Sequence, residues 1–274
     1  MAIIYAEAHL AATKIKVVGP ALVRFSHCRH GTMMYFPHDQ YIGASLEKYG
    51  EYNKDETEFL CNAIVEGSFV VEVGANIGTH TVPMAQKVGK KGHLLVFEPQ
   101  RVLHHMLCGN LAINALWNVT TERVALGSKK GTSLVPLIDY SEPGNFGSVE
   151  MSETEGEPVA LMRLDDYPIP ALHFLKIDVE GMELEVLKGA TELIKKYRPL
   201  IYCENDRPWK KAELLAYLRD VLEYDLYGHF PYLFNKQNYR ECPDNIFPNI
   251  ASSNMACIPR ERAEEIATNL PKVE

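Results

Sequence analysis

The sequence predicts an α/β protein in which a mostly parallel sheet carries helices on both faces. The first observation is an apolar run, Phe69 to Val73, that breaks into glycines and resumes as a helix. The second is the alternation of strand-like and helix-like stretches from Phe69 onward, which is typical of parallel sheets. The third is a set of apolar stripes at helical spacing between the strands, such as Val186, Ala190 and Leu193, which predict helices packed against the sheet.

The residues before this alternation are mixed in character. Ala21 to Phe36 alternates loosely and predicts a hairpin, while Asp39 to Tyr52 is polar, aromatic and rich in turn residues. This part is either a surface lead-in or a cap that folds over a bound ligand. Asp55 to Glu66 then predicts a helix with one apolar side. We therefore expect an N-terminal lead-in or cap over residues 1–54 and a main domain over residues 55–274.

Seven strands are expected in the main domain, and the last two should form an antiparallel C-terminal edge. Apolar runs bounded by turn residues define the strands. They are Phe69 to Val73, His93 to Glu98, Val119 to Arg123, His173 to Asp178, Pro199 to Glu204, and two more between Tyr224 and Ile258.

Residues 127–167 interrupt the alternation. Two short apolar runs, around Val135 and Leu161, flank a Gly- and Ser-rich stretch. This stretch carries six acidic residues and no Lys or Arg, and like charges keep a loop solvated. The segment is therefore either a mobile surface excursion or a lid-like insertion over a substrate.

The junction after Val73 predicts a nucleoside-containing ligand. A strand, glycine turn and helix expose backbone N–H groups to a cofactor, and Glu98, twenty residues past Gly78, can accept hydrogen bonds from ribose hydroxyls. Dinucleotide-binding turns require G-x-G-x-x-G, whereas this chain has Glu72-x-Gly74-x-Asn76-x-Gly78, with a side chain in the middle place. The acidic and polar residues suit the ammonium and sulfonium groups of S-adenosylmethionine.

Several separated blocks resemble the FkbM family of S-adenosylmethionine-dependent methyltransferases. The similarity spans about residues 40 to 206 and is carried by Val70 to Ala85, Val96 to Pro99, Leu175 to Glu183 and Leu187 to Ala190. It implies a Rossmann-like class I methyltransferase fold. It also implies methyl transfer, most often to a hydroxyl on a sugar or natural-product scaffold and in some members to an amide or peptide nitrogen.

The resemblance also assigns roles to individual residues. It favours a cap in which the lead-in folds over the methionine end of the cofactor, and Asn145 to Ser148 resembles an Asn-aromatic-Gly block of the family. The substrate-binding candidates are Asn145, Glu180 and His229. The cofactor-binding candidates are Glu72, Gly74, Asn76, Gly78, Thr79, Glu98, Ala125 and Asp178.

Acidic residues close four of the predicted strands. Asp178 should share the carboxyl edge of the sheet with Glu72, Glu98 and Glu204, and ligands of open α/β sheets bind outside that edge. The alternative for any of them is a helix N-cap, which applies most strongly to Glu180.

Attack by a hydroxyl requires a group that takes its proton. Asp178 is the first candidate for this base, followed by Glu204 and His229. Asp178 could instead hold the cofactor or a divalent cation such as Mg²⁺, which no metal-ligand motif in the sequence indicates. His80, which opens the helix after the glycine turn, either touches the methionine carboxylate or is structural.

Composition excludes several classes of partner. The net charge of -8 argues against nucleic acid, whose binding depends on Lys and Arg clusters. No stretch predicts a membrane span or a secretory signal, so we expect a cytoplasmic enzyme, free or as a homo-oligomer, acting on a small-molecule acceptor. The six cysteines show no C-x-x-C, and a Cys242 to Cys257 disulfide is the one alternative to free thiols.

Two other functional classes are weighed against a methyltransferase. A nicotinamide-dependent oxidoreductase should carry the G-x-G-x-x-G turn that this junction lacks. A non-catalytic module would bind the cofactor without turning over an acceptor.

Overall fold

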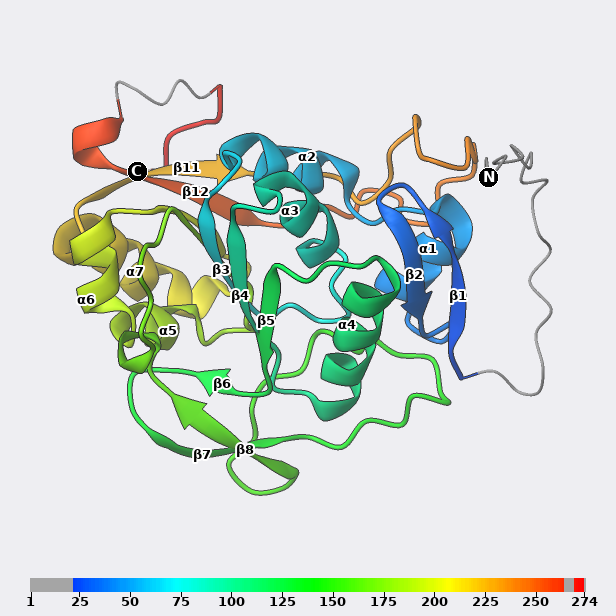
Figure 1. Cartoon of the computed structure of the whole chain (residues 1–274), viewed down its shortest axis with the longest axis horizontal. Coiled ribbons are helices and arrows are strands. Elements are labelled where there is room, and N and C mark those ends of the chain that lie inside the picture. The colour runs from blue at the N-terminus through cyan, green and yellow to red at the C-terminus, as the bar shows by residue number, and fades with distance from the viewer. Residues whose placement is uncertain (1–21, 264–268, 274) are drawn as a thin grey trace, which may run out of the picture.

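The computed structural model describes residues 22–263 and 269–273, and the predicted lead-in therefore lies partly, over residues 1–21, outside the described residues. A hairpin of β1 and β2 precedes a seven-stranded sheet flanked by helices (Figure 1). The strands are β1 (Arg24–Cys28), β2 (Gly31–Tyr35), β3 (Phe69–Val73), β4 (His93–Phe97), β5 (Val119–Glu122), β6 (Ala125–Leu126), β7 (Gly131–Val135), β8 (Glu157–Met162), β9 (Phe174–Ile177), β10 (Leu200–Glu204), β11 (Tyr224–His229) and β12 (Asn254–Pro259). The α-helices are α1 (Ile42–Tyr49), α2 (Lys54–Ala63), α3 (Thr81–Val88), α4 (Arg101–Ile113), α5 (Glu183–Lys188), α6 (Thr191–Tyr197) and α7 (Pro208–Ala216). Shorter turns of helix are η1 (Leu164–Asp166), the π-helix η2 (Tyr217–Val221) and η3 (Arg260–Arg262).

The main sheet has the order β11-β12-β10-β9-β3-β4-β5. The chain moves outward from β3 through β4 to β5 and then returns to the other side of β3 with β9 and β10. The strand order therefore reverses between β3 and β9, which is where open α/β sheets bind ligands.

The predicted seven strands are all present, and the antiparallel strand lies one position in from the edge. β12 runs antiparallel to both of its neighbours, β10 and β11. The outermost strand, β11, consequently runs parallel to the rest of the sheet, and it is separated from β10 by the width of β12.

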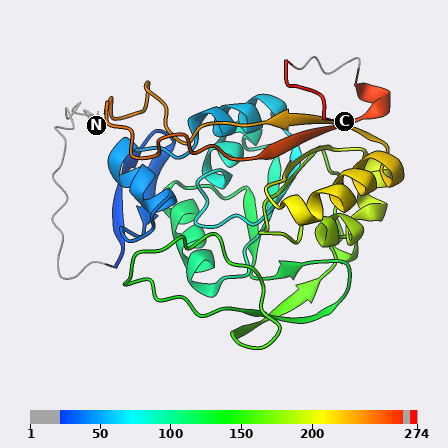
Figure 2. The same cartoon turned by 180° about the vertical axis from the view of Figure 1, so that it is seen from behind.

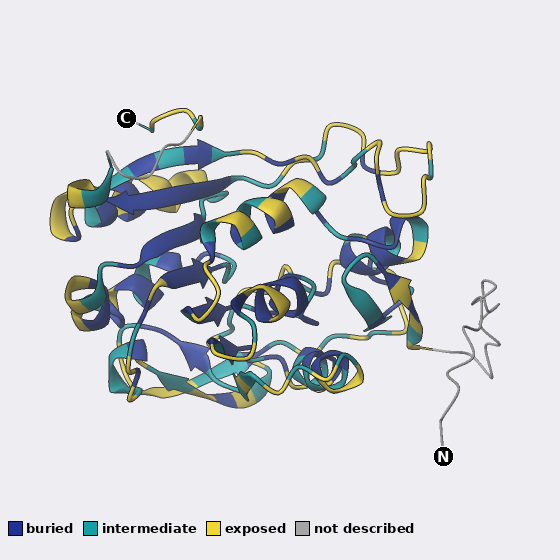
Figure 3. Cartoon of the chain, turned by 45° about the horizontal axis from the view of Figure 1, so that its top comes forward, coloured by how far each residue is buried: buried dark blue, intermediate teal, exposed yellow. Residues whose placement is uncertain are grey.

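Helices cover both faces because the central strands are apolar on both sides. Val70, Leu94 and Val96 pack with Leu60, Val82 and Leu103 of α2, α3 and α4. Val71, Leu95 and Phe97 pack on the opposite face with Val186, Ile194 and Leu214 of α5, α6 and α7. Figure 3 shows the strands as the buried layer between helices whose outer sides are exposed. Among the described residues, no helix combines the length and the apolar character needed to cross a membrane.

Residues 127–167 contribute strands to a second, three-stranded sheet of order β6-β8-β7 (Figures 1 and 2). The loop between β7 and β8 is anchored by Phe146, which is 2% exposed and packs against Phe36 and Tyr140. Arg101 and Arg123 pair with Glu157, and Arg207 pairs with Glu150, so two acidic residues of this segment contact cations on other parts of the chain. All six cysteines, including Cys242 and Cys257, are free.

Candidate active site

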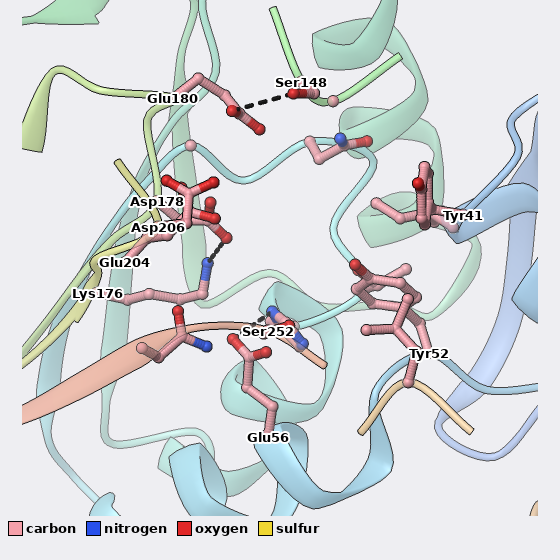
Figure 4. A pocket seen from close by; sticks show the side chains of 18 of the residues that line it. Tyr41, Tyr52, Glu56, Ser148, Lys176, Asp178, Glu180, Glu204, Asp206 and Ser252 are labelled. Atoms are coloured by element: carbon pink, nitrogen blue, oxygen red, sulfur yellow. Dashed lines mark hydrogen bonds and ion pairs between the residues drawn. The ribbon is translucent and has the colours of Figure 1, made fainter. Parts of the chain in front are cut away.

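A polar cavity opens at the carboxyl ends of β3, β9 and β10. Its remaining walls come from the segment around α1 and α2, the loop before β8, and residues 250–254 before β12 (Figure 4). Segments far apart in the chain therefore meet around one space at the point where the strand order reverses.

The glycine turn brings the backbone of β3 against the end of β9. Gly74 has φ +85°, and a Cβ placed on it would lie 1.7 Å from the Asp178 carbonyl oxygen, so no other residue fits there. Asn76 also adopts a left-handed conformation, with φ +52°, which asparagine tolerates better than most residues. Gly78 has φ +88° and lies close to Leu107, so it shapes the turn into α3 and does not line the cavity.

The carboxylate of Glu98 is 4% exposed and lies beside this turn. It accepts hydrogen bonds from the backbone N–H groups of Asn76 and Gln100, both at 2.8 Å. Burial raises the pKa of Glu98 to about 7, in spite of the opposing effect of these two bonds. The N–H groups hold the carboxylate at the end of β4, where it faces the cavity.

A smaller, more apolar pocket adjoins the polar cavity. Gly74, Glu98, Asp178 and Glu180 line both spaces. The smaller pocket is closed by apolar residues from four segments, namely Ala125, Leu126, Val135, Val149, Met151, Val179 and Met182. The two pockets together offer a flat apolar slot connected to a polar, acidic chamber.

A buried lysine, Lys176 of β9, lines the polar cavity between Glu72 and Asp178. Lys176 lies opposite Glu72 on the neighbouring strand, and its Nζ is 2.9 Å from Asp178 Oδ2 and 3.9 Å from Glu72 Oε1. Glu72 also accepts a 2.6 Å hydrogen bond from the Thr81 hydroxyl. Burial raises the pKa of Glu72 to about 7, against the opposing charge of Lys176. The Asp178 side chain is 38% exposed, so its carboxylate is held by Lys176 while still reaching the cavity.

Three further carboxylates, those of Glu180, Glu204 and Asp206, lie on the same side of the cavity as Asp178 (Figure 4). Oxygens of Glu180, Glu204 and Asp206 lie within 4.8 Å of one another, which makes this the one group in the described part of the chain that could hold a metal ion. Arg207 already pairs with Glu180 and Asp206. Burial and the neighbouring Asp178 raise the pKa of Glu204 to about 10 and that of Glu180 to about 7.

The structure brings most of the predicted site residues together. Ala125 lies in the apolar pocket. The polar cavity is lined by Glu72, Gly74, Asn76, Thr79, Glu98, Asn145, Asp178, Glu180 and Glu204. For Glu180, the predicted N-cap role does not hold, because its carboxylate pairs with Arg207 and accepts a 3.1 Å hydrogen bond from Ser148.

His229 is a predicted site residue that the structure places away from the cavity. It lines neither pocket, its ring packs on Phe59 in a tilted arrangement with centroids 4.7 Å apart, and its Nδ1 lies 2.8 Å from the Tyr202 hydroxyl. The physical reason is the position of β12, which separates β11 from β10 and so carries His229 away from Glu204. The structure therefore does not bring His229 together with Asp178, and its catalytic and substrate-binding roles stay predictions.

Sequence reasoning missed several residues of the polar cavity, among them Tyr52, Glu56, Lys176, Asp206 and Ser252. Tyr52, Glu56 and Ser252 come from segments outside the recognised blocks, whereas Lys176 lies inside one of them. A usable signal existed only for Lys176, because a charged residue within an otherwise apolar strand is unusual unless it is paired.

Comparison with known proteins agrees with this geometry. The family described as the methyltransferase FkbM domain matches residues 72–240. The chain is 35% identical to methyltransferase sdnD of Sordaria araneosa, over 55% of this chain and 75% of that protein. It is 28% identical to the hexuronic acid methyltransferase AglP of Haloferax volcanii, over 52% of this chain and 58% of that protein.

A solved FkbM methyltransferase from Methylobacillus flagellatus is 18% identical, with a TM-score of 0.46 over 70% of this chain and 44% of that one. The family match covers more than half of the present sequence and contains the glycine turn, Glu98 and the segment around Asp178. The protein therefore belongs to the FkbM family and is an S-adenosylmethionine-dependent methyltransferase.

Proposed function

We propose that this enzyme methylates a hydroxyl group of a small-molecule acceptor, a sugar or a related natural-product scaffold, inside the polar cavity. The observation that carries the proposal is the position of Asp178. Asp178 lines both the apolar pocket and the polar cavity, and its carboxylate accepts a hydrogen bond from Lys176. A group at that junction can contact both a cofactor in one space and an acceptor in the other.

The residues around the apolar pocket fit an adenosyl sulfonium. Ala125, Leu126 and Met182 offer apolar contacts for an adenine ring, and Glu98 lies at the pocket edge where ribose hydroxyls can donate to it. Gly147 lets the loop before β8 approach the glycine turn closely, since a Cβ on Gly147 would come within 2.6 Å of Asn76 Nδ2. Asn76 and Thr79 offer polar groups on the cavity side. The carboxylates of both spaces favour a positively charged ligand.

The bound cofactor supplies an electrophilic methyl group on its sulfonium. The protein has to hold the acceptor oxygen in line with that methyl group, at about 3–3.5 Å, and positioning of this kind supplies much of the rate. Asp178 takes the proton of the attacking hydroxyl, and the Lys176 ammonium orients its carboxylate by donating a 2.9 Å hydrogen bond to Oδ2. Glu204 lies nearby, but burial raises its pKa to about 10, so it is protonated at neutral pH and serves as a hydrogen-bond donor.

The choice of a small acceptor is supported by two facts. The polar cavity is enclosed by three separate segments, which leaves room for a small molecule or the end of a larger one. A relative in Haloferax volcanii is named as a hexuronic acid methyltransferase, so a sugar derivative is an acceptor within the family.

Asp178→Asn tests the proposal. With radiolabelled S-adenosylmethionine and a panel of glycosides and hydroxylated metabolites, we expect kcat to fall by about 10²-fold or more, since general-base catalysis is worth about 10²–10⁴-fold. Cofactor affinity, measured by calorimetry, should change far less than kcat. Asp225→Asn on β11, whose carboxylate pairs with Lys272, is the matched control. Full activity of Asp178→Asn would remove the base from this mechanism, and the same assay with chelator reports any role of a cation at Glu180, Glu204 and Asp206.

A further inference from the structure

One wall of the polar cavity has no role in the mechanism above. Tyr52, Glu56 of α2, His80 before α3, and Ser252 before β12 line it together, and we name these four residues the acceptor wall. Figure 4 shows Tyr52 and Glu56 across the cavity from Glu204 and Asp206. The acceptor wall therefore faces the space that an acceptor would occupy beside Asp178.

His80 leaves a hydrogen-bonding atom unused in this wall. The residue is 6% exposed, its Nδ1 lies 3.9 Å from Glu56 Oε1, and its buried Nε2 has no partner within the described protein. Burial and the nearby Lys176 lower the pKa of His80 well below its usual value, so the ring is neutral and carries one donor and one acceptor nitrogen. A buried ring nitrogen without a partner is costly, and a ligand hydroxyl would remove that cost.

Glu56 is the second residue of the acceptor wall that can contact a ligand hydroxyl, and hydrogen bonds fix its carboxylate. Glu56 is only 3% exposed, and its carboxylate accepts a 2.6 Å hydrogen bond from Asn53 Nδ2. Ser252 and Asn254 hydrogen-bond to it as well. These bonds fix the carboxylate from the protein side, while its position on the cavity wall leaves it within reach of a ligand hydroxyl.

The charge of the cavity restricts which acceptor can enter. Lys176 is the one ammonium or guanidinium among the described residues of the cavity lining, and it is already paired with Asp178 and Glu72. The lining carries seven carboxyl groups, those of Glu56, Glu72, Glu98, Asp178, Glu180, Glu204 and Asp206. Glu204 is protonated at neutral pH, and Glu56, Glu72, Glu98 and Glu180, with pKa values of about 7, are only partly ionised there. The remaining negative charge still exceeds the single positive charge of Lys176, so an acceptor that carries its own carboxylate would meet like charge, which opposes binding.

We propose that the acceptor wall is the acceptor-binding subsite and that it selects an uncharged, hydroxyl-rich molecule over a carboxylated one. In this choice the chain would differ from the relative named as a hexuronic acid methyltransferase, with which it would share only the sugar class of the acceptor. The carboxylate of Glu56 and the ring of His80 bind acceptor hydroxyls, and Tyr52 packs against the apolar face of the acceptor. This proposal rests on the proposed hydroxyl methylation and adds the class of acceptor and the residues that select it.

Matched pairs of methyl glycosides and the corresponding methyl glycuronides, in the gluco, galacto and manno series, test the selection. The two members of a pair differ only in a carboxylate at C6. We expect kcat/KM for the best neutral glycoside to exceed that of its uronide partner by on the order of 100-fold. Equal or better turnover of the uronides would overturn the acceptor class and leave hydroxyl methylation standing. Intact binding of S-adenosylhomocysteine with no methyl transfer to any glycoside would refute both this proposal and the sugar acceptor of the proposed function.

Two isosteric variants test the residues themselves. Glu56→Gln and His80→Asn should raise KM for the neutral glycoside by about 10-fold or more, with a smaller change in kcat, because each removes a binding contact. Glu58→Gln, on the same helix, and His105→Asn, on the exposed side of α4, are matched controls that should leave KM unchanged.

Calorimetry supplies the readout that does not depend on turnover. Both variants should bind S-adenosylhomocysteine within about 2-fold of the wild type and bind the glycoside to that complex less tightly. If His80→Asn weakens S-adenosylhomocysteine more than it weakens the glycoside, His80 belongs to the cofactor site and the proposal fails.

Discussion

Lys176 is buried among carboxylates from α2, β3 and the end of β9. Its residue is 1% exposed, and Asp178 and Glu72 lie 2.9 and 3.9 Å from its Nζ. Burial lowers the pKa of Lys176, but Asp178, Glu72 and Glu56 together raise it above its ordinary value. The ammonium therefore stays charged and compensates negative groups that have little access to water.

Removing this charge should cost stability. We expect Lys176→Met to lower the free energy of unfolding by about 3–5 kcal/mol, because it leaves buried carboxylates without their cation. Adding Glu72→Gln to the same chain should restore part of the loss, since it removes one of those carboxylates. Urea unfolding at pH 7.5 measures both, with Lys195→Met on the exposed side of α6 as the control. A loss no larger than that of Lys195→Met would contradict the role given to Lys176.

Glu98 allows a direct test of cofactor binding. Glu98→Ala should weaken S-adenosylhomocysteine by about 10-fold or more in calorimetry, because a hydrogen bond to a charged group contributes about 1.5–3 kcal/mol. The exposed Glu142→Ala, in the loop before β8, should bind normally. Unchanged affinity in Glu98→Ala would show that this carboxylate only holds the N–H groups of Asn76 and Gln100.

Site residues at strand ends could be predicted from the sequence, whereas those placed by long-range contacts could not. Glu98 and Asp178 were predictable because the carboxyl ends of parallel strands meet at one edge of a sheet. Glu56 was not, because it lies on a helix whose approach to the cavity depends on contacts with Ser252 and Asn254, about 200 residues further along the chain. The distance of His229 from both pockets was not predictable, because the sequence does not reveal that β12 inserts beside β10.

At the scale of elements, the turn between β3 and α3 joins the two halves of the site. Gly74 donates its N–H to the Phe97 carbonyl of β4 and lies against the Asp178 carbonyl after β9. One residue thus contacts the ends of both neighbouring strands. The sequence predicted the turn from its glycines, and the structure adds the reason why a side chain is excluded.

A comparison of Gly74 with Gly67 separates two reasons why a side chain is excluded at Gly74. One is its left-handed backbone conformation, and the other is its close contact with Asp178. Gly67 has φ +88°, close to the +85° of Gly74, but a Cβ there would meet nothing within 4 Å. Gly67→Ala should therefore lose only about 1–2 kcal/mol of stability, the cost of a left-handed alanine. Gly74→Ala should lose clearly more and also weaken cofactor binding, because Asp178 must move. Thermal unfolding with and without S-adenosylhomocysteine measures both quantities, and equal losses would show that strain in φ is the whole effect.

The segment between β6 and β9 was predicted only in outline. Its apolar runs predict β7 and β8. For its acidic loop, the sequence allows either a mobile surface excursion or a lid over a substrate. Arg207 pairs with Glu150 of this loop and with Glu180 of the cavity wall, and Gln100 donates to the Phe146 carbonyl at 3.0 Å. These partners lie tens of residues away, so no local pattern could have indicated where the loop packs. A lid role for the segment stays a prediction.

At the scale of the molecule, the number and the bounds of the strands followed from local patterns. Five of the predicted strands agree with β3, β4, β5, β9 and β10 to within one residue at each end. The order of the last two strands did not follow, because both are similar apolar runs and either could pair with β10. The interleaving of β12 depends on long-range packing, which periodicity does not encode.

The whole structure also gathers ionisable groups whose protonation is linked to folding. Burial raises the pKa of Glu56, Glu72, Glu98 and Glu180 each to about 7, and that of Glu204 to about 10. In the unfolded chain these carboxyl groups lose their protons near pH 4.3. Between that pH and the raised pKa the folded state binds more protons, so stability falls as pH rises. Buried histidines such as His80, whose pKa is lowered by burial, act in the opposite direction, but only below about pH 6.5.

Above pH 7 the carboxyl groups should therefore dominate. We expect the free energy of unfolding of the protein without ligand to fall between pH 7 and 8.5, with Glu204 contributing up to about 1.4 kcal/mol per pH unit, the value for one proton. Buried thiols with raised pKa values, such as Cys203, add a slope of the same sign toward pH 8.5, so the informative quantity is a difference between variants. Glu204→Gln cannot ionise and should flatten the slope, whereas the exposed Glu192→Gln should keep it. Urea unfolding in a single buffer series at constant ionic strength measures these slopes. Parallel slopes for Glu204→Gln and the wild type would mean that Glu204 ionises at the same pH in the folded and unfolded chains, and that the carboxylates around Asp178 repel one another less than their spacing implies.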